Sequence, residues 1–279
     1  MPQVSKRTIA RLIAGLLPLA VLGLASTYVN GAPVQTPDNE MVTVPAGSFE
    51  MGCNLAVDPL CFAITDEDQH SVHLDEFQID KYEVTFRRFQ KCVDAEICLP
   101  PAIGGGMNYD RFLNNEEVAK FPANGVTWEE ANKFCKFEGR RLPTEAEWEK
   151  TARGIDGRIY PWGNEHPTCE VTVMDGSLAG ELGCKTGNTF DVGSKHEGAS
   201  PYGAMDMAGN LWEWVADWHD DEYYQVSPEN NPKGPTTGIY KVARGGDFFS
   251  RKGYELRSSS RFFYEPSDYS IAVGFRCAK

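Results

Sequence analysis

Cysteine is the residue type in this sequence with the widest chemical reach, because a thiol can form a disulfide, bind a metal ion or take part in redox chemistry. The chain of 279 residues contains eight cysteines and five histidines. Paired Cys-x-x-Cys motifs, which are typical of zinc sites, do not occur, and the histidines do not cluster with the cysteines. We therefore predict four disulfide bonds, with zinc binding as the less favoured alternative.

Sequence separation suggests how most of these cysteines pair. Two pairs flank short loops, and a third pair brackets a loop that contains glycine. The three pairs are Cys53–Cys61, Cys92–Cys98 and Cys169–Cys184. The two cysteines that remain are Cys135, on a predicted helix, and Cys277, close to the C-terminus. A bond between them would close a long loop and would stabilise the fold by restricting the unfolded chain.

The N-terminus has the layout of a secretory signal peptide. Three basic residues precede the uncharged apolar stretch Leu12 to Ala25, which is shorter than the roughly 20 residues of a membrane-spanning helix. We expect a signal peptide over residues 1–25, with cleavage after Ala25 or as late as Ala32. An uncleaved N-terminal anchor is the alternative. The sequence thus predicts an exported protein, either periplasmic or secreted.

The exported chain is expected to consist of a polar linker, residues 26–40, and one domain, residues 41–279. Loss of the signal peptide removes three positive charges and no acidic residue, so the net charge changes from −13 to −16. So acidic a chain argues against nucleic acid or an anionic membrane as the main partner. We expect no membrane contact beyond the N-terminal anchor, if that anchor is retained.

The domain that positions these residues is expected to be irregular, with short elements of both kinds. Its glycines and prolines are spread along the sequence instead of being gathered in one linker, which indicates many turns. Alternating apolar residues from Met41 to Met51 predict a β-hairpin around the turn Pro45 to Gly47. The segment Val72 to Ile79 predicts one further strand. After Gly154 no long helical pattern is present.

Three helices are indicated by threonines that can cap a helix N-terminus. The first is expected to follow Thr85 and to run to about residue 93. The other two are expected to begin at capping boxes, formed by Thr127 with Glu130 and by Thr144 with Glu147.

Four segments, taken in chain order, carry a resemblance to a known family. They are Met41–Gly52; Pro122–Trp128 with Gly139–Glu149 and Pro161–Asn164; Tyr202–Trp214; and Arg244–Gly246 with Arg257, Arg261 and Gly274–Cys277. Together they cover nearly all of the sequence from Met41 onward. They resemble the domain of the formylglycine-generating enzymes, also called sulfatase-modifying factors. The resemblance implies an irregular α+β fold related to C-type lectins, and it implies that Cys135 pairs with Cys277.

The resemblance also implies a calcium site. The matching loop would supply the side chains of Asp206 and Glu213 and the backbone carbonyls of Gly209 and Leu211. Such a set suits a hard cation, which takes oxygen ligands at about 2.3–2.6 Å. The ion would have a structural role. The alternative is that the two carboxylates cap backbone amides.

The sequence departs from the family at the copper centre of the oxidases. Those enzymes carry two cysteines at the fourth and ninth positions after a Gly-Gly-Ser turn, and here the same positions after Gly246 hold Ser250 and Glu255. Asp247 replaces the serine of the turn. Linear Cu(I) coordination needs soft thiolates, whereas a hydroxyl and a carboxylate are hard ligands. Copper is therefore not expected as a cofactor, and copper-thiolate formylglycine synthesis is not expected as the activity.

The residues that surround this position are candidates for a ligand-binding groove. They are Trp212, Asp247, Ser250, Glu255 and Arg257. Two further arginines, Arg261 and Arg276, are expected to pair with buried carboxylates. We predict an accessory or divergent family member that binds a peptide or a small polar ligand, which could be part of another exported protein. The alternative is an enzyme, either a formylglycine-generating oxidase or another oxidative tailoring oxidoreductase of the family.

Overall fold

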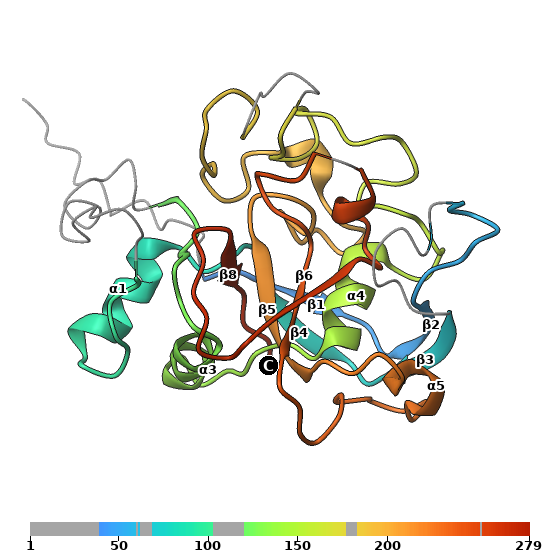
Figure 1. The fold of residues 1–279 in the computed structure, drawn as a ribbon, viewed down its shortest axis with the longest axis horizontal. Coiled ribbons are helices and arrows are strands. Elements are labelled where there is room, and N and C mark those ends of the chain that lie inside the picture. Colours follow the sequence, from blue (N-terminus) through green and yellow to red (C-terminus); the bar gives the residue numbers. More distant parts are fainter. Residues whose placement is uncertain (1–38, 60, 62–68, 103–119, 177–182, 252) are drawn as a thin grey trace, which may run out of the picture. The chain divides into compact units, whose positions relative to one another are not determined.

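The computed structural model describes residues 39–59, 61, 69–102, 120–176, 183–251 and 253–279 (Figure 1). The chain divides into a unit Met1–Gln35 and a unit Thr36–Lys279. The predicted signal peptide, both cleavage positions and most of the predicted linker lie outside the described residues. The helices and strands that the structure describes all belong to the second unit.

The N-terminal strands form two small antiparallel sheets. Strand β1 (Met41–Val44) pairs with β4 (Phe77–Asp80), and β2 (Gly47–Met51) pairs with β3 (His70–Leu74). The prediction of a hairpin between β1 and β2 is therefore wrong. The prediction of one continuous strand from residue 72 to residue 79 is also wrong, because this stretch contributes to both sheets.

Contacts with distant residues explain both differences. The side chain of Lys150 donates hydrogen bonds to the carbonyls of Pro45 (2.8 Å) and Gly47 (2.7 Å), so the turn binds a helix instead of closing a hairpin. Between β3 and β4, the backbone N–H of Asp75 donates to the side chain of Asn231 at 2.9 Å. Neither partner is close in sequence, so alternation of apolar residues carries no trace of them.

A four-stranded sheet in the order β7-β6-β5-β8 lies at the centre of the described structure (Figure 1). Its strands are β5 (Trp212–Trp218), β6 (Lys241–Arg244), β7 (Arg261–Tyr264) and β8 (Val273–Phe275). The pairs β5–β6 and β6–β7 are antiparallel, whereas β5 and β8 are parallel.

The three predicted helices are confirmed, each with its threonine cap. They are α1 (Phe86–Asp94), α3 (Trp128–Phe137) and α4 (Glu145–Arg153). At α4 the complete capping box forms, but at α3 the side chain of Glu130 instead accepts from the backbone N–H of Leu99 at 2.7 Å. Shorter helical segments are α5 (Tyr223–Val226) and the 3-10 turns His196–Gly198 and Gly253–Leu256. Of the helices described, none is both long and apolar enough to cross a membrane.

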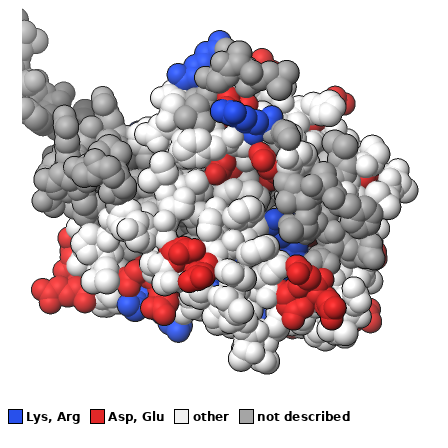
Figure 2. Space-filling model, viewed as in Figure 1, with Lys and Arg blue, Asp and Glu red and all other residues white. Residues whose placement is uncertain are grey.

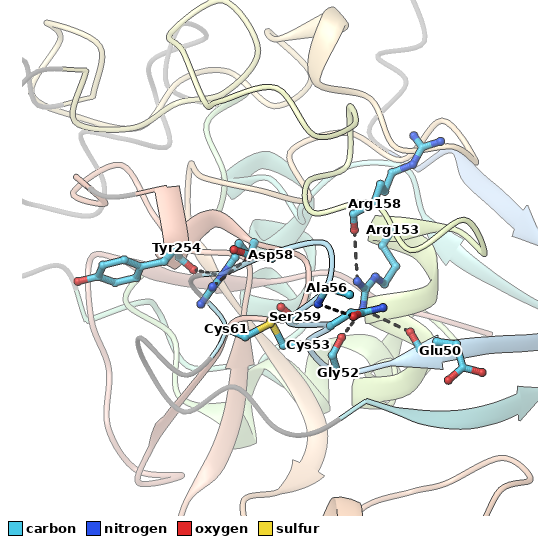
Figure 3. The surroundings of a disulfide bond; sticks show 12 residues. Glu50, Gly52, Cys53, Ala56, Asp58, Cys61, Arg153, Arg158, Tyr254 and Ser259 are labelled. Atoms are coloured by element: carbon cyan, nitrogen blue, oxygen red, sulfur yellow. Dashed lines mark hydrogen bonds and ion pairs between the residues drawn. A yellow bond between two sulfur atoms is a disulfide. The ribbon is translucent and has the colours of Figure 1, made fainter.

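All eight cysteines form the four predicted disulfides, Cys53–Cys61, Cys92–Cys98, Cys135–Cys277 and Cys169–Cys184. The bond between Cys135 and Cys277 joins α3 to the C-terminus across a sequence separation of 142 residues. In the chain-entropy description a loop of this length contributes about 5 kcal/mol. Figure 3 shows the Cys53–Cys61 bond, with Arg153 nearby donating to the carbonyl of Gly52.

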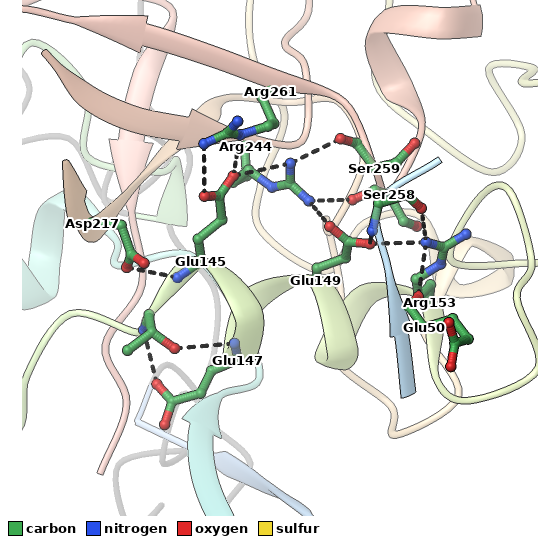
Figure 4. Close-up of polar contacts among 12 residues, drawn as sticks. Glu50, Glu145, Glu147, Glu149, Arg153, Asp217, Arg244, Ser258, Ser259 and Arg261 are labelled. Atoms are coloured by element: carbon green, nitrogen blue, oxygen red, sulfur yellow. Dashed lines mark hydrogen bonds and ion pairs between the residues drawn. The ribbon is translucent and has the colours of Figure 1, made fainter. Parts of the chain in front are cut away.

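Helix α4 is buried along its whole length although most of its residues are polar. Its carboxylates meet guanidinium groups from the central sheet and from its own last turn (Figure 4). Glu149 pairs with Arg244 and, at 2.8 Å, with Arg153. Glu145 pairs with Arg261 at 2.7 Å and with Arg244 at 3.3 Å. This places Arg261 in the role predicted for it, as the partner of a buried carboxylate.

Because Arg244 ends β6 and Arg261 begins β7, the carboxylate of Glu145 holds both ends of the segment between them. Burial acts to raise the pKa of Glu145, but the charges of Arg261 and Arg244 outweigh burial and hold this pKa below its usual value. The carboxylate of Glu145 is thus charged at neutral pH and forms ion pairs with both arginines.

Replacement of Glu145 by Gln should lower the free energy of unfolding by about 3 to 5 kcal/mol, because it leaves two buried guanidinium groups with one carboxylate fewer. Urea unfolding followed by tryptophan fluorescence measures the change. The matched control is Glu129→Gln on the exposed face of α3, which should cost less than about 0.5 kcal/mol. Equal losses in the two variants would contradict the role given to Glu145.

Candidate functional site

A hollow of about 280 Å³ lies beside the segment that follows β6. Its lining residues are Trp212, Asp247, Phe249, Ser250, Glu255, Arg261, Phe262 and Tyr264. Gly246 allows the segment to fold tightly here, since it has a φ of +73° and a Cβ atom would lie 2.8 Å from the carbonyl oxygen of Glu255. The same Cβ would lie 3.1 Å from the hydroxyl of Ser250.

The structure brings together four of the five predicted groove residues. Trp212, Asp247, Ser250 and Glu255 line the hollow, so the two positions that hold cysteine in the copper oxidases face one space. Arg257 is not among the lining residues. Its guanidinium is buried, with 1% of the residue exposed, and it pairs with Asp58 at 3.0 Å. Because Asp58 lies 199 residues earlier in the chain, local sequence gives no sign of this contact.

Asp247 is a strongly perturbed carboxyl group of the hollow. Burial raises its pKa to about 6, and the charge of Glu255 adds to the rise, whereas hydrogen bonds from Ser250 and Phe249 oppose it. One carboxylate oxygen, Oδ1, accepts from the hydroxyl of Ser250 at 3.1 Å and from the N–H of Phe249 at 3.0 Å. The hydroxyl of Ser250 in turn accepts from the N–H of Asp247 at 3.0 Å.

Aromatic side chains form much of the remaining wall, and three of them, Phe249, Phe262 and Tyr264, were not predicted from the sequence. Phe262 lies between Trp212 and Tyr264, with ring centroids 5.5 and 4.9 Å away. Phe249 and Phe262 are each 41% exposed. Burial raises the pKa of Tyr264, and the neighbouring charge of Asp247 raises it further. The run of three aromatic residues after Arg261 was the available signal for this wall.

No thiol is available in this hollow, because every cysteine of the chain is bonded to another cysteine. Its two carboxylates and its hydroxyl are hard oxygen donors, which do not suit Cu(I). The lining residues therefore do not fit the copper centre of the oxidases.

A larger hollow of about 550 Å³ lies elsewhere, between β3, β4 and the first turn of α4. It contains none of the predicted site residues. Its lining includes Arg141 and Glu147, which pair with each other at 2.6 Å. This hollow is larger, but it does not contain the residues that the family resemblance points to.

The predicted calcium ligands Asp206 and Glu213 are both buried. Asp206 has a φ of +58°, and its carboxylate accepts from the N–H of Gly193 at 2.5 Å. Glu213 pairs through both oxygens with Arg276, at 2.6 and 2.7 Å, as expected for that arginine. It also accepts from the indole N–H of Trp148 at 2.9 Å. Calcium binding therefore stays a prediction.

A third carboxylate belongs to the same neighbourhood. Glu83 is fully buried; burial raises its pKa, and the charges of Asp206 and Glu213 raise it further. Its Oε2 accepts from the side chain of Asn210 at 2.6 Å, whereas Oε1 has no hydrogen-bond partner. Three buried carboxylates thus share the charge of Arg276, and one buried oxygen is unsatisfied. The unsatisfied oxygen of Glu83 suits a cation with hard oxygen ligands, whereas both oxygens of Glu213 are already bonded to Arg276.

Comparison with known proteins identifies the family of this chain. The domain described as "Sulfatase-modifying factor enzyme 1-like domain" matches residues 26–279. The chain belongs to this family. It is 29% identical to the formylglycine-generating enzyme of Mus musculus, in a match that covers 86% of this chain and 74% of the mouse protein. It is 30% identical to that of Thermomonospora curvata, with 85% and 92% covered.

Solved structures support the same conclusion for the fold. The structure of PvdO from Pseudomonas aeruginosa matches with a TM-score of 0.68 and 25% sequence identity, over 87% of this chain and 95% of that chain. The predicted fold class, an irregular and disulfide-stapled α+β domain of the formylglycine-generating-enzyme type, is confirmed. The four disulfides are also compatible with an exported member of the family.

Replacement of Asp247 by Asn should change how stability depends on pH. The carboxyl of Asp247 has a pKa of about 6 in the folded protein and near 4 in the unfolded chain, so it binds its proton more tightly when the protein is folded. Its contribution to the free energy of unfolding is therefore present below about pH 4 and is lost as the pH rises to about 6. The free energy of unfolding of the unmodified protein, relative to the Asn variant, should therefore fall by about 2 to 3 kcal/mol over this range.

Urea unfolding at several pH values measures this difference. The exposed carboxylate of Asp220 provides the control, Asp220→Asn, which should not show the same dependence. A difference that stays constant from pH 4 to pH 6 would mean that Asp247 is not perturbed in the folded protein.

Proposed function

We propose that this family member is exported, lacks copper-thiolate chemistry and binds a peptide or small polar ligand in the hollow between Trp212 and Tyr264. The observation that carries the proposal is the pairing of all eight cysteines, together with Ser250 and Glu255 at the positions of the two copper-binding cysteines. The hollow keeps polar groups and an aromatic wall, which can orient a ligand, but it holds no redox-active thiol.

The acidic character of the chain supports a partner other than nucleic acid or an anionic membrane. Figure 2 shows acidic side chains gathered in several separate groups on the face viewed. The proposed partner is a peptide segment of another exported protein. The protein would then act as an accessory or divergent member of the family.

The second candidate is an oxidative tailoring activity that does not use copper thiolates. The observation that favours it is the likeness to formylglycine-generating enzymes and to PvdO over more than four fifths of the chain. In that case the same hollow would hold the substrate, and the oxidising group would have to come from a bound cofactor. The two candidates differ in whether the bound ligand is chemically changed.

Ligand-observed NMR with mixtures of short peptides and small polar molecules should reveal compounds that bind the hollow. Binding should be weakened by at least about tenfold in Phe262→Ala, because Phe262 is 41% exposed and forms part of the wall. Ile239→Ala removes an exposed apolar side chain that does not line the hollow, and it should leave binding unchanged.

Mass spectrometry of the recovered compounds separates the two candidates, because a binding protein returns its ligand intact. A cysteine peptide of the sulfatase type, incubated with the protein and copper, should show no aldehyde. Aldehyde formation would overturn the proposal, and so would the absence of any compound whose binding depends on Phe262.

We also propose that calcium binds in the loop of Asp206 and Glu213, with the carbonyls of Gly209 and Leu211 as further ligands. Calcium should raise the melting temperature of the protein relative to the chelated protein, because the ion binds the folded state only. Asp206→Ala should remove this gain, whereas Asp220→Ala at an exposed position should keep it. An equal melting temperature with calcium and with chelator would exclude the site.

A further inference from the structure

The two carboxylates of the hollow have no cation to neutralise them within the described chain. Asp247 is 7% exposed, and although its Oδ1 accepts two hydrogen bonds, its Oδ2 accepts none from the described residues. Glu255 accepts one hydrogen bond, from the backbone N–H of Arg251 at 3.0 Å. Neither carboxylate forms an ion pair with a described residue. A buried carboxylate normally has such a partner.

The arginine that lines the hollow does not change this balance. Arg261 donates to both oxygens of Glu145, at 2.7 and 3.1 Å, and its guanidinium lies 4.5 Å from the ring centroid of Tyr224. Its charge is therefore used within the buried network. The side chain of Arg251 is directed to Asp175, at 2.8 Å. The hollow thus presents negative charge that its neighbouring arginines do not compensate.

The rest of the wall is aromatic, which has a specific electrostatic consequence. The faces of Trp, Tyr and Phe rings carry partial negative charge and attract cations. Trp212, Phe262 and Tyr264 form a continuous row on one side, and Phe249 contributes a fourth ring. Carboxylates and ring faces around one space favour the same kind of ligand, because both attract positive charge.

Other ligand classes fit less well. Among the described lining residues, an anion would meet two carboxylates without a cationic partner and no available cation. A neutral hydroxyl or amide would leave the charge of Asp247 without a partner at low exposure. A hard metal ion takes about six or more oxygen ligands, whereas the described lining offers two carboxylates and one hydroxyl among aromatic rings.

We infer that the hollow between Trp212 and Tyr264 binds an organic cation, that is, an ammonium or guanidinium group. This inference rests on the proposed binding function and specifies its ligand class. A volume of about 280 Å³ suits one such group with its carbon stem, and not a large molecule. The group is carried either by a small amine or by a lysine or arginine side chain of a peptide.

Isothermal titration calorimetry of the exported chain tests the inference. The probes are acetylated tripeptide amides of the form Gly-Xaa-Gly, with lysine, arginine, glutamine or glutamate at the centre, and the small amines choline and agmatine. At least one cationic probe should bind about tenfold more tightly than the glutamine and glutamate peptides. Tighter binding of an amine would identify a free small molecule as the source, and tighter binding of a peptide would identify a protein segment.

Substitutions in the residues that line the hollow provide a second test of the inference. Asp247→Asn and Glu255→Gln should each weaken the cationic probe by about tenfold, since each removes a charge but keeps the shape. Phe262→Leu should weaken it by about threefold, because it keeps apolar volume and removes the ring face. The control Asp220→Asn should leave the affinity unchanged.

The outcomes separate this inference from the proposed function. If the glutamine or glutamate peptide binds as tightly as the cations and Phe262→Ala abolishes that binding, the hollow is a binding site and the inference of an organic cation is wrong. The inference is also wrong if Asp247→Asn and Glu255→Gln leave the cation affinity unchanged. If no probe and no compound of the NMR screen binds in a Phe262-dependent way, the proposed function itself fails.

Discussion

The buried ion pairs of α4 are the interaction on which the other parts of the site depend. Transfer of charged side chains out of water is costly, and it is tolerated only when each charge meets an opposite charge in good geometry. Glu145 and Glu149 meet this condition only if Arg244 and Arg261 stay where β6 and β7 place them. The helix and the two strands are therefore fixed relative to one another, and with them both ends of the segment that lines the hollow.

A buried disulfide adds to this arrangement, and the pairing of all cysteines also limits the chemistry of the hollow. The bond between Cys135 and Cys277 ties the C-terminal residues that follow β8 to α3, and β8 in turn pairs with β5 next to the hollow. In the copper oxidases of the family, some cysteines staple the fold and two perform chemistry. Here all eight are staples. The same covalent framework that stabilises the fold therefore leaves the hollow with oxygen donors and aromatic rings only.

Much of this could be predicted from sequence where the signal is local or the family pattern is strong. Threonine caps located three helices, and spacing with family resemblance located four disulfides. The predictions that were wrong share a physical cause: the residue that binds the segment in question lies far away in the sequence. The turn at residues 45–47 binds Lys150 instead of closing the expected hairpin, and Arg257 pairs with Asp58 instead of lining the hollow. The aromatic wall of β7 was missed because a strand pattern does not reveal which face borders an open space.

The contrast between the two charged regions explains why the hollow, and not α4, is the functional candidate. In α4 every carboxylate has a cationic or backbone partner, so its charges serve the fold. Asp247 is almost as buried, yet one of its oxygens has no partner among the described residues, and burial raises its pKa to about 6. A buried carboxylate that the described chain leaves without a cationic partner is kept at a cost to stability. Such a cost is expected where a group must meet a ligand from outside, because a partner inside the chain would compete with that ligand.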